Sequence, residues 1–208
     1  MTSIALVDYG MGNRRSVEKA LEHVGARVRR TADRDEIAAA DGVLVPGVGA
    51  FPEAMRRLSA AGLDEVVRER ANAGVPVLGI CLGMQLLFDS STEHEGAEGL
   101  GLIPGTVTRL DARGAKLPHI GWNEVVFRRE GALTRRLGPT AAFYHVHSFV
   151  CRPSEDADVV GTGEYGESFT SIVERGHVMG AQFHPEKSSR AGLALLDNFV
   201  AACATVRA

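Results

Sequence analysis

The sequence has little of what marks membrane, secreted or nucleic-acid-binding proteins. No apolar run approaches the ~18 residues of a membrane span, and the start of the chain lacks the basic and apolar regions of a signal peptide. The net charge of -3 argues against a coat of nucleic acid. The three cysteines, Cys81, Cys151 and Cys203, cannot all pair with one another, which indicates free thiols in a reducing cytoplasm. We therefore expect a cytoplasmic protein with no membrane and no nucleic acid as partner.

The rest of the composition is typical of one globular domain. The chain has 208 residues, of which 45% are hydrophobic and 24% charged, and we expect a single domain over residues 1–208. A domain of this size buries roughly 70% of its unfolded surface, so it needs no disulfide or metal for stability. Only three of the 23 basic residues are lysines: Lys19, Lys116 and Lys187. Each lysine is noticeable against that background, because arginine replaces a compact ammonium group poorly.

The order of the predicted elements indicates an α/β fold. In the first half, strands are predicted at 3–8, 27–31, 42–45 and 76–80, and helices at 14–24, 51–60, 63–73 and 82–90. This alternation favours βαβ units, and hence a central, mostly parallel sheet flanked by helices. Between 105 and 183 the chain is predicted to form short strands that extend the sheet in antiparallel fashion. The stretch 190–204 is predicted as a closing amphipathic helix.

The sharpest local feature is the segment Gly79-Ile80-Cys81-Leu82-Gly83, between an apolar strand and a helical pattern. A nucleophile in such a place sits on a tight turn, and small flanking residues let its side chain project. The positive end of the following helix would stabilise a thiolate at Cys81. The competing interpretation is a buried structural cysteine, since free cysteines are often simply core residues.

A thiol nucleophile requires a base, and the segment His184-Pro185-Glu186 follows an apolar run as the loop after a strand would. His184 could deprotonate Cys81, and Glu186 could orient the imidazole by accepting its other N–H. The order nucleophile, histidine, acid differs from that of the α/β-hydrolases, which argues against that fold. The alternative is an ordinary surface turn that contains proline.

An oxyanion at this nucleophile would need two hydrogen-bond donors. The amide of Leu82, next after Cys81, is placed to supply one of them. The segment Pro46-Gly47-Val48-Gly49 ends another predicted strand. Its two glycines permit a peptide flip that would turn the amide of Val48 toward the same site. A plain glycine-rich turn is the alternative.

These three segments, in this order, resemble the class I (triad) glutamine amidotransferases. The resemblance rests on PGVGAF at 46–51, GICLGMQLL at 79–87 and QFHPEKS at 182–188. It implies a glutaminase in which Cys81 attacks the side-chain amide of glutamine, ammonia leaves, and water releases glutamate from a thioester. It also implies that His184 is the general base and acid, oriented by Glu186, and that the site uses neither a metal nor a cofactor.

The resemblance further implies which residues hold the substrate, L-glutamine. Gly49, Gln85 and Glu93 match positions that bind glutamine in this family. The backbone around His147, Ser148 and Phe149 would hold the α-amino and carboxylate groups.

Three further segments are similar to those of one branch of the family, the glutaminase subunits of imidazole glycerol phosphate synthases in histidine biosynthesis. They are VDYGMGN at 7–13, HIGWNEV at 119–125 and YHVHSF at 144–149, in which His145 stands where an apolar residue is usual. The similarity implies a heterodimer with a (β/α)8-barrel cyclase subunit that receives the ammonia. The products would be imidazole glycerol phosphate and aminoimidazole carboxamide ribonucleotide.

A partner must seal the site, because free ammonia becomes protonated and escapes. Asn13 follows the first predicted strand and could hydrogen-bond across an interface, or else cap the helix that starts at Arg14. Trp122, the only tryptophan, could anchor an interface or be a core aromatic. Asn123 could order the barrier to ammonia. Lys187, directly after Glu186, could form a salt bridge to the partner or be simply solvated.

Two histidines, His145 and His147, lie two positions apart on a predicted strand and hence on one face. Such a pair can bind a metal, but no cysteine or acidic cluster completes a tetrahedral site. We therefore expect no metal, and we place His147 near bound glutamine. Cys151 and Cys203 are expected to be inert.

Two other functions compete with the leading hypothesis. The first is a glutaminase that feeds a different ammonia-using synthase, which would share the triad but not the HIGWN segment. The second is an inactive scaffold that only binds and regulates a partner, against which the complete set Cys81, His184 and Glu186 argues.

Overall fold

A parallel sheet forms the centre of the molecule, which the computed structural model describes for residues 1–205. Its strands, in spatial order, are β2 (Arg27–Thr31), β1 (Ser3–Val7), β3 (Gly42–Val45), β4 (Val77–Ile80) and β13 (Val178–Ala181). Each strand pairs in parallel with the next. Every residue of β3, β4 and β13 is buried. A strand covered on both faces is apolar throughout rather than alternating, which explains these short hydrophobic runs.

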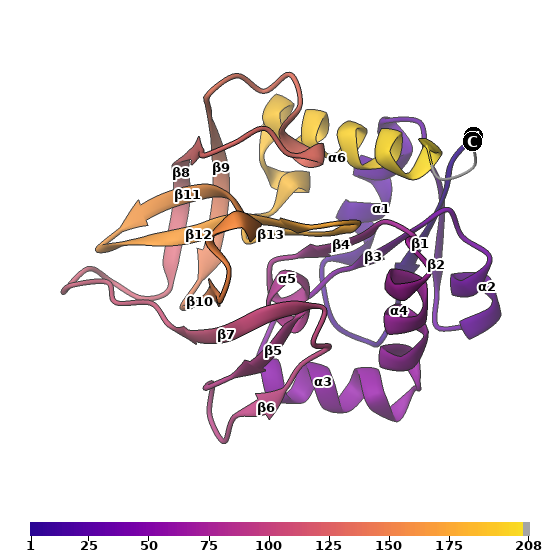
Figure 1. Cartoon of the computed structure of the whole chain (residues 1–208), viewed down its shortest axis with the longest axis horizontal. Coiled ribbons are helices and arrows are strands. Elements are labelled where there is room, and N and C mark those ends of the chain that lie inside the picture. The colour runs from indigo at the N-terminus through magenta and orange to yellow at the C-terminus, as the bar shows by residue number, and fades with distance from the viewer. Residues whose placement is uncertain (206–208) are drawn as a thin grey trace.

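Beyond β13 the sheet continues mainly with antiparallel strands (Figure 1). The path runs through β12 (Glu167–Arg175), β10 (Phe149–Pro153), β7 (Ile103–Arg109), β5 (Phe88–Ser91) and β6 (Ala97–Glu98). From β12 a side branch leads through β11 (Val159–Tyr165) to β8 (His119–Phe127) and β9 (Thr140–His147). The predicted fold class, a mostly parallel sheet extended by antiparallel strands, is confirmed.

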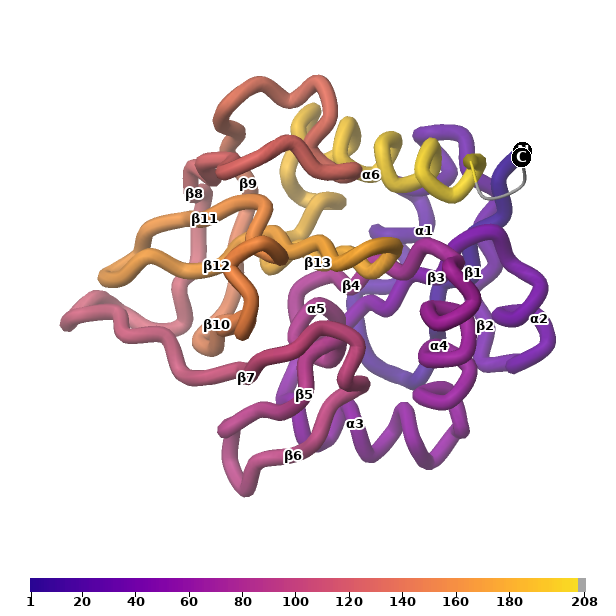
Figure 2. The backbone as a smooth tube through the Cα atoms, viewed as in Figure 1, coloured from indigo at the N-terminus to yellow at the C-terminus, as the bar shows by residue number. Residues whose placement is uncertain are grey.

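Helices cover both faces of the parallel strands, as Figures 1 and 2 show. On one face lie α1 (Arg14–His23) and α6 (Ser189–Ala204); on the other lie α2 (Arg34–Ala38), α3 (Phe51–Ala60) and α4 (Leu63–Asn72). Alternate residues of β1 pack against the two helix layers. Ile4 and Leu6 pack with α1 and α6, whereas Ala5 and Val7 pack with the other helices. No helix within residues 1–205 is long and apolar enough to cross a membrane.

The helix predicted over 82–90 is wrong beyond Leu86. The helix α5 covers only Leu82–Leu86, and β5 begins two residues later. The carbonyl of Leu86 accepts the N–H of Leu100 at 2.8 Å, and the carbonyl of Leu87 accepts that of Ile103 at 3.0 Å. A segment that follows in the chain therefore captures the carbonyl groups that a longer helix would use. Hydrophobic spacing within 82–90 carries no sign of this pairing.

Other short elements were not predicted from the sequence. They are α2, the strands β5, β6 and β10, and the 3-10 turns η1 (Ala132–Thr134), η2 (Asp156–Asp158) and η3 (Pro185–Lys187). The helix α2 begins at a side-chain cap, because Asp33 accepts the N–H groups of Asp35 and Glu36. Such an element is too short to show helical periodicity.

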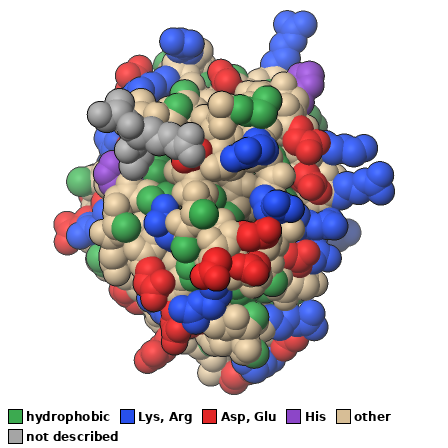
Figure 3. Space-filling view, turned by 90° about the vertical axis from the view of Figure 1, so that its right-hand side faces the viewer, with side chains coloured by type: hydrophobic (Ala, Val, Ile, Leu, Met, Phe, Trp, Pro, Cys, Tyr) green, Lys and Arg blue, Asp and Glu red, His purple; other side chains and the backbone are tan. Residues whose placement is uncertain are grey.

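Charged side chains occupy the free edge of the sheet at β2. Figure 3 shows this side of the molecule, where basic and acidic side chains are interspersed. Arg29 of β2 pairs with Glu36 at 3.4 Å, and Arg34 pairs with Glu65 at 2.9 Å. Charge on an edge strand opposes pairing with a strand of another chain, so this edge is protected against aggregation.

Gly83 gives a test of how tightly α5 packs against β3. A methyl group at Gly83 would lie 1.9 Å from the carbonyl oxygen of Val45, so one of the two backbones would have to move. We predict that Gly83→Ala lowers the free energy of unfolding by at least about 1–3 kcal/mol, measured by urea denaturation.

Gly114→Ala is the matched control for this substitution. Gly114 has a φ of +88° but nothing within 4 Å of an added methyl group, so only the left-handed conformation would cost, by about 1–2 kcal/mol. A smaller cost at Gly83 than at Gly114 would contradict the close approach of the two elements.

Candidate active site

The carboxyl ends of the central parallel strands border a cleft of about 220 Å³. Ligand sites of open α/β sheets lie at this edge. Ten of the residues predicted from the sequence line the cleft: Val48, Gly49, Cys81, Leu82, Gln85, Glu93, His147, Ser148, Phe149 and His184. Pro118 and Val146 also line it and were not predicted. Folding thus brings together segments that are far apart in the sequence.

Cys81 occupies a strained turn between β4 and α5. Its φ is 55° and its ψ -114°, a conformation that a residue with a side chain rarely adopts. Its N–H donates to the carbonyl of Ala181 at 2.7 Å, and its Sγ lies 3.7 Å from the carbonyl oxygen of Val146. The thiol therefore faces the cleft, whereas Cys151 and Cys203 are fully buried.

His184 and Glu186 form a buried pair beside this cysteine. The Nδ1–H of His184 donates to Oε1 of Glu186 at 3.0 Å, and the two side chains are 5% and 1% exposed. Nδ1 is thereby occupied, and Nε2 is the ring nitrogen available to Cys81. Burial opposes the charged imidazolium, but hydrogen bonds to Cys81 and Glu186 outweigh it and raise the pKa of His184 to about 9.

The turn that carries this pair is fixed by backbone contacts to β9. The N–H of His184 donates to the carbonyl of Tyr144 at 2.9 Å. Ser188 Oγ donates to the carbonyl of His184 at 2.7 Å and accepts the N–H of Tyr144 at 2.9 Å. Pro185 then opens η3 with a fixed φ. These contacts hold His184 rigidly against the end of β13.

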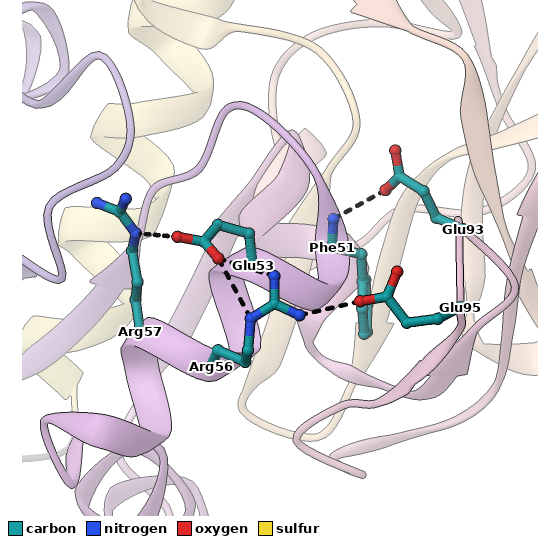
Figure 4. A network of polar contacts seen from close by, with 6 residues as sticks. All are labelled: Phe51, Glu53, Arg56, Arg57, Glu93 and Glu95. Carbon is teal, nitrogen blue, oxygen red and sulfur yellow. Dashed lines mark hydrogen bonds and ion pairs between the residues drawn. The ribbon is translucent and has the colours of Figure 1, made fainter.

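The opposite wall of the cleft is held by Glu93 and Gln85. Oε2 of Glu93 accepts the N–H of Phe51, the first residue of α3, at 2.8 Å (Figure 4). A carboxylate at a helix N-terminus is stabilised by the helix dipole. Nε2 of Gln85 donates to the carbonyl of Phe149 and to Oε1 of Gln182, both at 3.1 Å. Gln85 therefore ties α5 to the backbone predicted to hold glutamine.

Figure 4 shows that the loop carrying Glu93 is also tied to α3. Arg56 of α3 pairs with Glu95 at 2.9 Å and with Glu53 at 2.8 Å. Exposed ion pairs of this kind contribute little to stability. The hydrogen bond from Phe51 to the half-buried Glu93 is therefore the less exposed of these links between the loop and the helix.

A chain of hydrogen bonds leads from the cleft to the face of β8. Nδ1–H of His147 donates to the carbonyl of Phe149 at 3.1 Å, so its Nε2 must accept, and it accepts Nδ1–H of His119 at 3.1 Å. Nε2 of His119 in turn accepts the side-chain amide of Asn123 at 3.4 Å. Burial lowers the pKa of His147 to about 3, which fits the neutral tautomers that this chain requires. His119 is thus a site residue whose role the sequence did not reveal.

His145 belongs to the core rather than to the cleft. It is fully buried, with Nδ1–H donating to the carbonyl of Phe143 at 3.0 Å and Nε2 lying 2.9 Å from the hydroxyl of Ser171. Burial lowers the pKa of His145 to about 3. Within residues 1–205, no three side chains of histidine, cysteine, aspartate or glutamate are grouped so as to hold a metal ion.

The four residues predicted at a docking face lie outside the set of residues that lines the cleft. Asn13 occupies the N-cap position of α1 but makes no side-chain cap; its amide donates instead to Oε1 of Glu186 at 3.4 Å. Trp122 is 56% exposed. The alternatives of a helix cap and of a core aromatic are therefore wrong. Asn123 is half-buried and donates to the carbonyl of Glu164 at 2.9 Å.

The ring of Tyr144 links Trp122 to Lys187, the residue after the triad acid Glu186. Lys187 is exposed, and its Nζ lies 6.0 Å from the centre of the Tyr144 ring. Trp122 packs edge-on against the same ring, with 6.2 Å between the ring centres. Trp122, Tyr144 and Lys187 thus form one continuous surface, which we call the rim.

The fold and this site together define a class of protein. A cysteine on a strained turn after a parallel strand, a buried His–Glu pair after the adjacent strand and a cleft between them are the features of a triad-type amidotransferase. A family model described as "Glutamine amidotransferase class-I" matches residues 5–203. The chain therefore belongs to the class I glutamine amidotransferase family.

Several relatives of high identity share one name. A protein of Moorella thermoacetica named "Imidazole glycerol phosphate synthase subunit HisH" is 54% identical over 96% of this chain and 94% of its own length. One of Bacillus cereus with the same name is 48% identical over 94% of this chain and 93% of its own length.

Solved structures show the same fold at lower identity. A putative GMP synthase protein from Thermoplasma acidophilum superposes with a TM-score of 0.74 at 20% identity, covering 100% of this chain and 96% of that one. The PurLQS structure from Thermotoga maritima gives 0.75 at 19% identity, covering 100% and 99%. At this identity the likeness concerns the fold alone.

The raised pKa of His184 predicts a specific pH dependence. In nuclear magnetic resonance spectra its imidazole should titrate near pH 9, and Cys81→Ala should lower that midpoint, because one of the two stabilising hydrogen bonds is lost. A midpoint at or below 6.5, the ordinary value, would contradict the geometry of the pair.

The raised pKa of His184 also makes the stability of the fold depend on pH. Since the folded pKa of about 9 lies above 6.5, protonation of His184 stabilises the fold below pH 6.5, and this contribution is lost as the pH rises through about 9. The stability difference between the wild type and His184→Gln should shrink over that range.

Proposed function

We propose that this chain is the glutaminase subunit of imidazole glycerol phosphate synthase in histidine biosynthesis. It hydrolyses L-glutamine to glutamate and ammonia and passes the ammonia to a cyclase subunit. The observation that carries the proposal is that Cys81 and His184 line one cleft and share a hydrogen bond, while Glu186 accepts the other ring N–H of His184 at 3.0 Å. The chain is also 54% identical to a relative that bears the name of this subunit.

The first chemical step is the attack of the Cys81 thiolate on the side-chain amide carbon of glutamine. The thiolate is the nucleophilic form, and His184 would generate it by taking the Cys81 proton, for which its raised pKa suits it. As the carbon–nitrogen bond breaks, His184 gives this proton to the leaving amide nitrogen, and ammonia departs. Cys81 is left as a glutamyl thioester, and Glu186 holds the imidazole in place throughout.

The second step reverses the roles of the same groups. Neutral His184 takes a proton from water, the hydroxide attacks the thioester carbonyl, and the bond to Cys81 Sγ breaks. Glutamate is released and the proton is again shared by the Cys–His pair. Ammonia must leave the cleft before water enters it. The order of these two events therefore affects how much ammonia reaches the partner.

Both steps pass through an oxyanion, which two backbone amides would stabilise. Leu82 begins α5 directly after Cys81, and its amide is one donor. The amide of Val48 is the other; Val48 lines the cleft from the loop after β3. Gly49 next to it has a φ of 105°, so this loop holds a backbone conformation that other residues rarely adopt.

The remaining lining residues would hold glutamine itself. Gly49, Gln85 and Glu93 contribute one wall, with the carboxylate of Glu93 facing the α-amino group. The backbone of His147, Ser148 and Phe149 forms the other wall and would bind the α-amino and carboxylate groups. The hydrogen bond from Gln85 to the carbonyl of Phe149 keeps the two walls at a fixed separation.

We place the partner on the rim. The partner would be a (β/α)8-barrel cyclase subunit that receives ammonia and forms imidazole glycerol phosphate and aminoimidazole carboxamide ribonucleotide. Ile120 and Trp122 are 59% and 56% exposed on β8, and Val48 is 42% exposed at the cleft. Apolar side chains of this size on the surface are typical of a protein interface. Asn13 and Asn123 would lie where the seal meets the site, in a cytoplasmic heterodimer.

The enzymatic assignment predicts a partner-dependent glutaminase. Release of glutamate should rise when the cyclase partner is added together with its nucleotide substrate, and Cys81→Ala should abolish it, since the nucleophile is lost. Glu186→Gln should lower kcat, because the His184 imidazolium loses its counter-charge. Steady-state glutamate assays measure all three.

The outcome of this assay separates the competing functions. Full activity of Cys81→Ala would overturn the mechanism. Stimulation by a different synthase, and none by the cyclase partner, would favour the other glutaminases. Absence of activity and of Cys81 labelling by a glutamine-analogue electrophile, with partner and ligand present, would favour the inactive scaffold.

The rim indicates which substitutions should weaken the complex with the cyclase partner. Trp122→Ala should weaken binding of the cyclase partner by roughly tenfold or more, as expected for an aromatic anchor. Lys187→Ala should weaken it in a salt-dependent manner, whereas Lys19→Ala, a substitution of an exposed lysine on α1, should not. Isothermal titration calorimetry tests this, and equal effects of the two lysine substitutions would contradict the docking face.

A further inference from the structure

The turn between β1 and α1, residues 9–13, packs against the loop 46–49 that carries Val48. The hydroxyl of Tyr9 donates to the carbonyl of Pro46 at 2.6 Å, and Tyr9 is only 6% exposed. A methyl group at Gly12 would lie 3.2 Å from Cβ of Pro46, and one at Gly49 would lie 2.8 Å from Cε of Met11. The two loops are therefore in contact along their length.

Gly47 lies between the Tyr9 hydroxyl and the nucleophile turn. A methyl group at Gly47 would meet the Tyr9 hydroxyl at 2.9 Å and both Cβ of Leu82 and the N of Gly83 at 2.8 Å. Burial, and then the nearby Cys81, raise the pKa of Tyr9, so its hydroxyl keeps its proton and acts as a donor. The loop 46–49 is thus packed at Gly47 between the Tyr9 hydroxyl and the turn after Cys81.

The hydrogen bond from Tyr9 fixes the start of the loop 46–49. The carbonyl of Pro46 belongs to the peptide that joins Pro46 to Gly47, immediately before Val48. A buried hydrogen bond of 2.6 Å opposes rotation of that peptide. The Val48 amide then depends on a backbone whose start is anchored, and an oxyanion donor must be held within a few tenths of an ångström to be effective.

We propose that Tyr9 is a positioning residue for the oxyanion loop: its hydrogen bond to Pro46 sets the place of the Val48 amide. The inference rests on the proposed glutaminase activity, which it deepens. The turn that carries Tyr9 also carries Asn13, whose amide donates to Glu186. A partner that presses on residues 9–13 would thus act on the oxyanion loop and on the triad acid through one short segment.

The test compares two substitutions that each remove one tyrosine hydroxyl. Tyr9→Phe deletes the bond to Pro46 and leaves the ring to fill the core. Tyr165→Phe is the matched control, because its hydroxyl also donates to a backbone carbonyl, that of Lys116, at 2.8 Å. Glutamine hydrolysis is measured in the complex with the cyclase partner, together with the rate at which iodoacetamide alkylates Cys81.

Alkylation separates positioning from a general structural effect. It requires the Cys81 thiolate but forms no oxyanion, so it reports the Cys–His pair alone. Cys151 and Cys203 are fully buried, and peptide mapping assigns the label to Cys81. We expect Tyr9→Phe to lower kcat at least about tenfold, with KM and the alkylation rate changed less than about twofold. Tyr165→Phe should leave kcat, KM and the alkylation rate unchanged.

Three results would overturn the inference. They are an unchanged or higher kcat in Tyr9→Phe, a parallel fall of kcat and alkylation, and an equal fall of kcat in Tyr165→Phe. Failure of the proposed function is distinguishable from all three, because the wild-type complex would then release no glutamate from glutamine.

Discussion

One backbone hydrogen bond determines where the site can form. The N–H of Cys81 donates to the carbonyl of Ala181 at 2.7 Å, one step beyond the parallel ladder in which Ile80 pairs with Ala181. This bond places the nucleophile beside the strand end that leads to His184. The parallel pairing of β3 with β4 brings the loop after Val45 to the same edge. Any shift of register between β4 and β13 would separate the cysteine from its base.

Three neighbouring histidines are all buried, yet their pKa values are shifted in opposite directions. His145 and His147 are buried among aromatic rings, and this burial keeps them neutral and lowers the pKa of each to about 3, although a backbone carbonyl beside each ring acts in the opposite direction. His184 is buried as well, but Glu186 and Cys81 provide hydrogen bonds that favour its charged form and raise its pKa to about 9. Partners rather than depth therefore decide which histidine holds a proton. Neutral His147 lines the cleft and neutral His145 lies in the core, whereas His184 is suited to proton transfer.

The strands and turns that depend on local sequence pattern could be predicted from the sequence. The strands that precede Cys81 and His184 are short apolar runs, and the turns after them are marked by glycine or proline, so the triad segments could be located without a structure. The helix after Cys81 was predicted too long, because the partner of its last carbonyls lies at residues 100–103.

What the sequence could not predict are contacts between segments far apart in the chain. Tyr9 with Pro46, His119 with His147 and Asn13 with Glu186 are each made by residues whose types are compatible with several roles. Asn13 before Arg14 has the local pattern of a helix cap, yet its side chain turns away to the triad acid. Trp122 could have been a core residue by its type, and only the structure shows its exposure.

The central claim is that Cys81 carries the glutamyl group during turnover. Mass spectrometry of the complex, quenched in acid while it hydrolyses glutamine, tests this most directly. We expect a glutamyl adduct on the peptide that contains Cys81. Turnover of glutamine with Cys81 unmodified, or an adduct on another residue, would contradict the account.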